Sequence, residues 1–132
     1  MDIRIIVSAS LFVMAQTPLS PPTPVSRQCD KHIPFLFAGK AQADPSTLKM
    51  NNDGGWCWFD NTSLPHGTAK FVAELRVSRL PTHGQIIIGP ASDSNKTRVS
   101  YKPDKGYIGT DSFAVINMTT NNERRVDVTI VP

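Results

Sequence analysis

The chain has 132 residues, of which 39% are hydrophobic and 19% are charged, and its formal net charge is +3. This length suits one domain of ordinary size, and the apolar content excludes a wholly disordered chain. A weak positive charge is far from the concentrated basic surface of a nucleic-acid-binding protein, so we expect no nucleic acid as partner. Eleven Pro and eight Gly favour many turns, and therefore strands over long helices.

The N-terminus has the layout of a secretory signal peptide. Arg4 precedes an apolar run over residues 5–15, which is too short to span a bilayer because that takes about 20 residues. Val13 and Ala15 then stand at the two positions where small residues precede cleavage. We expect residues 1–15 to be removed on secretion or export to the periplasm, with no stable membrane insertion afterwards. The alternative is a buried N-terminal strand or helix.

The next segment, residues 16–28, contains four prolines among Thr and Ser. Such sequences prefer extended polyproline conformations and have little to bury. The sequence therefore predicts a Pro-rich tether over residues 16–28 and a single folded domain over residues 29–132.

Cys29 and Cys57 are the two cysteines of the chain. In an exported protein an even number favours a disulfide, whereas the cytosolic alternative is two buried thiols. There is no Cys-x-x-Cys pair, so a zinc or redox site is disfavoured. We predict a Cys29–Cys57 disulfide and no metal.

The expected domain contains seven short runs with strand character. Period-two alternation is clearest in residues 124–131, where Val126, Val128 and Ile130 share one face. Together with frequent turn signals, this pattern is typical of an antiparallel sandwich or barrel. The predicted strands are residues 33–38, 56–59, 70–79, 85–88, 98–102, 112–118 and 124–131. Residues 41–49 allow a single helical turn, capped near Asp44 or Ser46.

Two motifs carry a resemblance to a known family. Residues 81–86 read Pro-Thr-His-Gly-Gln-Ile, and residues 101–113 follow the pattern Y-x-P-x-x-G-Y-x-G-x-D-x-F. With the closing strand, they resemble bacterial Ig-like and cadherin-like repeat domains over roughly residues 70–131. The resemblance implies an Ig-like antiparallel β-sandwich of about seven strands, in a family of spacers, adhesion units and binding domains. The N-terminal half lies outside the pattern, and the acidic calcium-binding motifs of cadherins are absent.

The second motif also has a direct physical interpretation. Two glycines provide positions open to positive φ, Tyr107 offers a hydroxyl to nearby backbone, and an aspartate accepts backbone N–H bonds before a core phenylalanine. The structural turn residues are Gly106, Tyr107, Gly109, Asp111 and Phe113.

No residue pattern indicates catalysis. His32, His66 and His83 lack the spacing of metal ligands, and Gly-x-Ser-x-Gly, phosphate-loop and dinucleotide motifs are absent. Three aspartates lie in turn-rich segments where this residue is ordinary: Asp60, Asp104 and Asp111. We therefore predict no enzyme, no catalytic residue and no cofactor.

The candidate binding residues are Trp56 and Trp58. In a strand they share one face, while Cys57 and Phe59 share the other. If Cys57 and Phe59 face the core, two indoles lie side by side outside and mark a binding surface. The alternative places both tryptophans in the core and the disulfide at the rim.

These observations favour a non-enzymatic secreted or periplasmic module that binds a protein or glycan of the cell envelope. The net charge of +3 adds a mild preference for acidic components. The alternatives are a structural spacer, and a small envelope-polymer hydrolase or hydrolase inhibitor.

Overall fold

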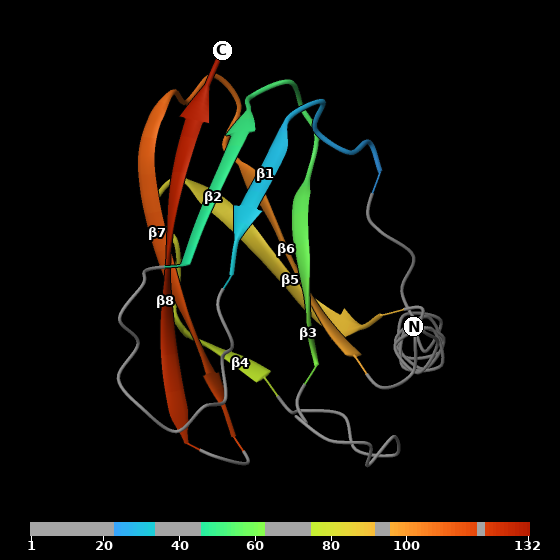
Figure 1. Ribbon diagram of the computed structural model, residues 1–132. Coiled ribbons are helices and arrows are strands. Elements are labelled where there is room, and N and C mark those ends of the chain that lie inside the picture. The colour runs from blue at the N-terminus through green and yellow to red at the C-terminus, as the bar shows by residue number, and fades with distance from the viewer. Residues whose placement is uncertain (1–22, 34–45, 63–74, 92–95, 119–120) are drawn as a thin grey trace, which may run out of the picture.

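A computed structural model describes residues 23–33, 46–62, 75–91, 96–118 and 121–132, and Figure 1 shows their arrangement. The described residues form strands and connections, and none of their segments is a helix long and apolar enough to cross a membrane. The expected signal peptide, most of the expected tether, residues 34–38 and His66 lie outside the described ranges. The strands are β1 (Cys29–His32), β2 (Ser46–Asn51), β3 (Cys57–Thr62), β4 (Leu75–Arg79), β5 (Gly84–Pro90), β6 (Lys96–Pro103), β7 (Gly109–Asn117) and β8 (Asn122–Val131).

The strands build two sheets, as the all-β sandwich prediction requires. One sheet has five strands in the order β1-β2-β8-β7-β4, and the other has three in the order β3-β6-β5. Eight strands are described in place of about seven. Every pairing between named strands is antiparallel except β2 with β8, which run parallel. Among the described strand pairs, this parallel pair departs from the antiparallel sandwich expected.

The predicted helical turn over residues 41–49 is wrong in its described part. Residues from Ser46 onward form β2, in which Ser46, Leu48 and Met50 are buried at every second position. The strand pairs with β1 on one side and β8 on the other, so its backbone groups are satisfied without a helix. The capping character of Ser46 is a local preference that this pairing overrides.

The core lies between the sheets and is built from alternating positions. Val126, Val128 and Ile130 face inward from β8, as the pattern predicts. Phe113 is fully buried on β7, and its ring stacks on that of Tyr101 with centroids 5.9 Å apart. The remaining core residues are Leu48, Met50, Cys57, Phe59, Leu75, Val99 and Val115.

A disulfide joins the edges of the two sheets. Cys29 of β1 and Cys57 of β3 are bonded at 2.09 Å, with Cα atoms 5.2 Å apart. Figure 1 shows β1 beside β3 at this edge. The predicted disulfide is confirmed.

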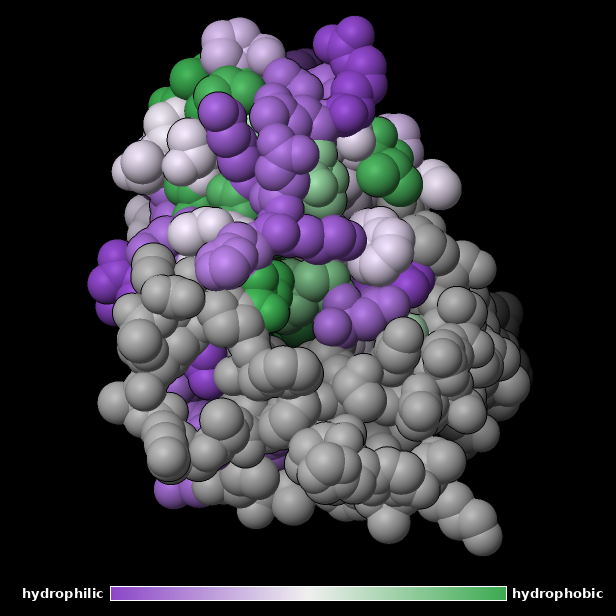
Figure 2. Space-filling view, in the orientation of Figure 1, coloured by the Kyte–Doolittle hydropathy of each residue, from purple (hydrophilic) through white to green (hydrophobic). Residues whose placement is uncertain are grey.

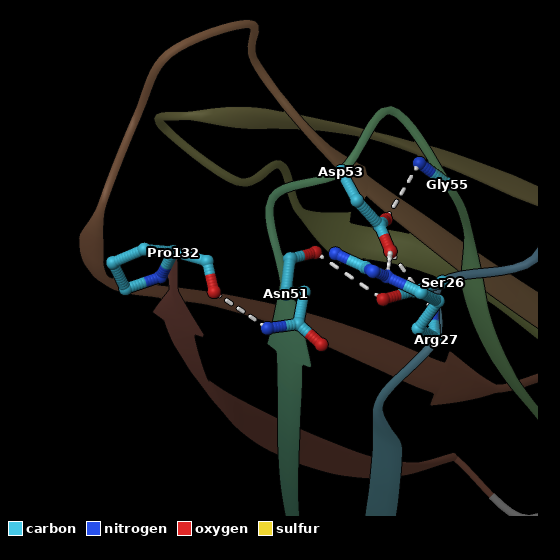
Figure 3. A network of polar contacts seen from close by, with 6 residues as sticks. All are labelled: Ser26, Arg27, Asn51, Asp53, Gly55 and Pro132. Atoms are coloured by element: carbon cyan, nitrogen blue, oxygen red, sulfur yellow. Dashed lines mark hydrogen bonds and ion pairs between the residues drawn. The ribbon is translucent and has the colours of Figure 1, made fainter.

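The residues just before β1 pack against β3. The backbone N–H of Trp56 donates to the Pro24 carbonyl, and that of Ser26 donates to the Trp56 carbonyl, both at 2.9 Å. Figure 3 shows the Asp53 carboxylate accepting the backbone N–H groups of Arg27 and Gly55, at 2.9 and 3.1 Å. Residues 24–28, expected to belong to the tether, are therefore part of the folded domain.

The same region holds the C-terminus. The side-chain amide of Asn51 donates to the Pro132 carbonyl at 2.6 Å, and the Ser26 hydroxyl donates to the Asn51 carbonyl at 3.3 Å (Figure 3). Hydrogen bonds thus join three parts of the chain on one side of the sandwich: residues 24–28, which we call the N-terminal segment, the end of β2, and Pro132.

Candidate functional site

The side chains of β3 alternate between the core and the outer face of the three-stranded sheet. Cys57 and Phe59 are buried in the core, which places Trp58 on the outer face, where it is half-buried. Trp56, just before the strand, is 8% exposed, because the N-terminal segment bridges to it at Val25. The two indoles therefore differ: Trp58 is partly open to solvent and Trp56 is largely covered.

Two cations hold the indole of Trp58. The Lys31 ammonium lies 4.0 Å from the ring centroid and the Arg98 guanidinium carbon lies 3.9 Å from it. Cations over an indole are attracted by the electron-rich ring face. Lys31 Nζ also donates to the Trp58 carbonyl at 2.7 Å, so the side chain of β1 is anchored to β3 by two contacts.

The two cations reach Trp58 from different sides of β3. Trp56 exchanges backbone hydrogen bonds with Pro24 and Ser26, so its N–H and C=O point away from β6. Two residues later, the backbone N–H and C=O groups of Trp58 point the same way, toward β1 and Lys31. Arg98 belongs to β6, on the opposite side of β3. The Trp58 indole therefore lies between Lys31 of β1, an edge strand of the five-stranded sheet, and Arg98 of β6, the middle strand of the three-stranded sheet.

Arg98 is held by an ion pair with Asp60, its cross-strand partner. Nε and Nη2 of Arg98 donate to the two carboxylate oxygens at 2.7 and 3.0 Å, and the Arg98 side chain is only 6% exposed. The third nitrogen, Nη1, is buried with no hydrogen-bond partner. The guanidinium lies against the indole, and an aromatic face accepts N–H groups weakly. We attribute the unpaired nitrogen to this stacking.

Lys31 has a perturbed titration. Partial burial lowers the pKa of its ammonium, the charge of Arg98 lowers it further, and the Asp60 carboxylate raises it in part. A third cation, the ammonium of Lys102, lies 5.7 Å from the centroid of the Trp56 ring. We call the set of Lys31, Trp56, Trp58, Arg98 and Lys102 the cation–aromatic face. Figure 2 shows hydrophilic side chains gathered over β1, the strand that carries Lys31.

The turn residues form a separate structural cluster. Gly106 and Gly109 have φ of +80° and +139°, in the region that favours glycine. The Tyr107 hydroxyl donates to the Thr110 carbonyl at 2.6 Å, and Phe113 is in the core. Asp111 accepts hydrogen bonds from several segments, so these five residues fix the turn and its place against the core.

The residues considered for chemistry do not converge. His83 stacks on Tyr107 with ring centroids 3.9 Å apart, while His32 ends β1. Asp60 is engaged by Arg98. Among the described residues no group of three or more His, Cys, Asp or Glu is placed to hold a metal ion.

A polar depression of about 490 Å³ lies beside β7 and β8. Arg125 and Asp127 pair with each other in it at 2.7 Å, with side chains 63% and 47% exposed. Its lining residues are Thr82, His83, Thr110, Asp111, Ser112, Arg125, Asp127, Val128 and Thr129. Exposed ion pairs contribute little energy, and we assign this depression no ligand.

Sequence reasoning singled out the tryptophans but missed the cations. Arg98 and Asp60 become partners only through the β3–β6 register, and Lys31 reaches Trp58 only because the disulfide brings β1 beside β3. The predicted disulfide combined with the spacing Cys29–Lys31 is the signal from which the Lys31 contact was foreseeable.

No family model matches the chain, and the search of curated proteins gave no match. Among solved structures, a cysteine protease inhibitor from Entamoeba histolytica is similar, with a TM-score of 0.36 and 14% identity. The similarity covers 64% of this chain and 84% of that chain. A likeness of this strength carries no argument about function.

Proposed function

We propose that this chain is a non-enzymatic binding module that is exported and binds an acidic component of the cell envelope through the cation–aromatic face. The observation that carries the proposal is Trp58, a half-buried indole held on the outer face between Lys31 and Arg98. Tryptophan and arginine concentrate binding energy at interfaces, and this pair is fixed before any partner arrives.

The charges of the face favour a negatively charged partner. Three cations, Lys31, Arg98 and Lys102, lie at the two indoles, and the carboxylate of Asp60 is paired with one of them. An excess of positive charge on one face attracts anions and speeds encounter with them. Because cations already lie over the Trp58 ring, a neutral sugar stacked flat on this indole is disfavoured. A carboxylate or phosphate group that meets Lys31 and Lys102 is a better fit.

Different observations support the proposed compartment. Disulfides persist in oxidising compartments outside the cytosol, and Cys29–Cys57 is such a bond. The signal-peptide layout of residues 1–15 and the resemblance to bacterial Ig-like domains support the same location. A hydrolytic role has less support, because Asp60 is committed to Arg98 and Asp111 to backbone donors.

The test compares partner capture by matched variants. Immobilised wild-type protein and the variants Trp58→Ala, Lys31→Gln and Lys102→Gln are incubated with envelope extract and, separately, with polygalacturonate and uncharged dextran. Wild type should bind polygalacturonate and not dextran, and its affinity should fall as salt is raised. Each variant should bind about tenfold more weakly, which corresponds to about 1.4 kcal/mol.

Lys49→Gln is the matched control, because Lys49 is an exposed lysine of β2 in the other sheet. It should bind like wild type. Circular dichroism checks the fold of each variant, and Lys102→Gln keeps the test decisive if Trp58→Ala unfolds. Folded variants that keep wild-type affinity for every partner would contradict the proposal.

A further inference from the structure

The strand β5 ends the three-stranded sheet, and among the described strands it forms a ladder with β6 only. Its free edge is defined by the register. The backbone N–H and C=O groups of Trp56 point away from β6. Those of the next residue, Cys57, therefore point toward β6, where Cys57 pairs with Tyr101. Backbone groups alternate sides along a strand, so Ser100 points toward β5 and pairs with Ile87. The N–H and C=O groups of Ile86 and Ile88 therefore point outward from the free edge.

Within the described part of the chain, this edge lacks the charges and the covering strand that normally protect an edge strand. Native proteins cover or charge their edge strands, because unpaired backbone groups invite another strand. The sequence of β5 is Gly-Gln-Ile-Ile-Ile-Gly-Pro, with no charged residue and with proline only at the last position. Ile87 is 41% exposed on the outer face, and the inward Ile86 and Ile88 are only partly buried. The strand is long and apolar, and no second strand among the described residues pairs with its outer edge.

We propose that two copies of the chain pair through β5 in antiparallel fashion, with the two-fold axis at Ile87. The strand runs from Gly84 to Pro90, so Ile87 is its centre and an axis there pairs the whole strand with itself. Ile86 then lies opposite Ile88 of the second copy, and the reverse pair is identical. These are the residues whose N–H and C=O groups point outward, so each pair exchanges two backbone hydrogen bonds.

The side chains complement the backbone pairing. Ile87 lies opposite Ile87 of the second copy in a non-hydrogen-bonded pair, where side chains are closest. The two exposed isoleucines thereby cover each other. A contact centred on uncharged strands also brings no like charges together, although each chain has a net charge of +3. This self-complementarity is what favours a second copy over an unrelated strand.

The dimer has a consequence for the cation–aromatic face. The pairing makes a continuous six-stranded sheet in the order β3-β6-β5-β5-β6-β3, with the axis perpendicular to it. Both cation–aromatic faces then lie on the same side, with the two β3 strands about 24 Å apart at about 4.8 Å per strand. An acidic polymer can contact both faces at once and gain avidity. The pairing itself does not depend on the proposed function.

Cysteine substitutions test the register. Ile87→Cys should form an intermolecular disulfide under mild oxidation, because non-hydrogen-bonded antiparallel pairs have Cα atoms about 4.5 Å apart, within disulfide range. Gln85→Cys is the matched control on the same face of β5. Its counterpart lies four residues along the ladder, about 13 Å away, and should not cross-link. Peptide mapping without reduction confirms that Cys29–Cys57 remains paired.

Solution mass completes the test. Light scattering with size exclusion should give the mass of two chains for wild type and of one chain for Ile87→Lys, which places two charges at the axis. Ile87→Lys should unfold at the wild-type temperature when both are compared as monomers. A wild type that is still monomeric at about 100 μM, and therefore has a dimer dissociation constant weaker than about that value, would overturn the proposal. Equal cross-linking of Gln85→Cys and Ile87→Cys would also overturn it.

Discussion

Asp111 accepts four hydrogen bonds from three segments of the chain. The backbone N–H groups of Thr82 and Ser112 donate to Oδ1 at 3.0 and 2.8 Å, while the backbone N–H of His83 and the hydroxyl of Tyr101 donate to Oδ2 at 2.9 and 2.8 Å. Burial alone raises the pKa of Asp111, but these four donors outweigh it and the pKa is lowered. One carboxylate thus fixes the β4–β5 turn to β6 and β7.

Tyr101 is the buried donor of this group. Burial and the neighbouring Asp111 raise the pKa of its phenol, so the hydroxyl stays protonated and donates. Its ring packs on Phe113 and against Gly84, where an added Cβ would lie 2.6 Å from the hydroxyl oxygen. The position therefore demands an aromatic ring for packing and a hydroxyl for the carboxylate.

We predict that Tyr101→Phe lowers the free energy of unfolding by about 1.5–3 kcal/mol, the usual value for a hydrogen bond to a charged group. The ring and its packing remain, so urea denaturation should show a lower midpoint with an unchanged slope. Tyr107→Phe is the control, because its hydroxyl bonds a neutral carbonyl at an exposed position, and it should cost about 0.5–1.5 kcal/mol.

The same variant has a pH signature. A carboxylate with a lowered pKa stabilises the folded state above its unfolded value of 3.8, and this stabilisation is lost as pH falls through the lowered pKa. Without the Tyr101 hydroxyl, the pKa of Asp111 lies closer to 3.8. The difference between wild type and Tyr101→Phe should therefore shrink as pH falls from about 5 to about 2. A difference that is constant with pH would contradict the assigned role of Asp111.

Among the elements, those with both alternation and turn signals were predictable. β5, β6 and β8 each contain the predicted run and extend it by one or two residues at one or both ends, while β7 begins three residues before its predicted run and ends one residue before the end of that run. The expectation failed at the polar elements. β1 has the sequence Cys-Asp-Lys-His, and three of its four side chains are exposed. The strand therefore has no apolar alternation from which it could be predicted. Its pairing with β2 and its disulfide, both long-range contacts, place it.

The N-terminal segment depends on a glycine of the β2–β3 connection. A Cβ on Gly55 would lie 2.7 Å from the Cα of Ser26, closer than real side chains approach backbone. At the neighbouring Gly54 there is open space, but φ is +82°. Two adjacent glycines are therefore required for different reasons, one for close approach and one for conformation.

We predict that Gly55→Ala displaces residues 24–28 from β3, whereas Gly54→Ala leaves them in place. Gly54→Ala should cost about 1–2 kcal/mol through backbone strain, and Gly55→Ala about 1–3 kcal/mol through overpacking. Hydrogen exchange separates them, because the amides of Ser26 and Trp56 should lose protection only in Gly55→Ala. Retained protection of both amides in Gly55→Ala would show that the segment does not need this close approach.

At the scale of the whole molecule, the two sheets are held together along both of their sides. On one side the Asp111 cluster fixes the β4–β5 turn, and on the other the Cys29–Cys57 disulfide joins β1 to β3. The fold class and the disulfide were predictable because alternation and cysteine number are local or compositional signals. The cation–aromatic face was predictable only at Trp56 and Trp58, because its cations come from strands distant in sequence.

The disulfide side has a measurable energetic role. The bond closes a loop between residues 28 positions apart, and restricting the unfolded chain in this way stabilises the fold by about 3–4 kcal/mol on the chain-entropy model.

We predict that reduction lowers the free energy of unfolding by this amount and slightly raises the urea slope, because the reduced unfolded chain exposes more surface. Urea denaturation with and without reductant measures both quantities. The double variant Cys29→Ala and Cys57→Ala is the control, and its curve should not respond to reductant. Reduction should also weaken polygalacturonate binding, because β1 then no longer holds Lys31 against Trp58. A reduced protein with the oxidised midpoint would show that packing alone closes this side of the sandwich.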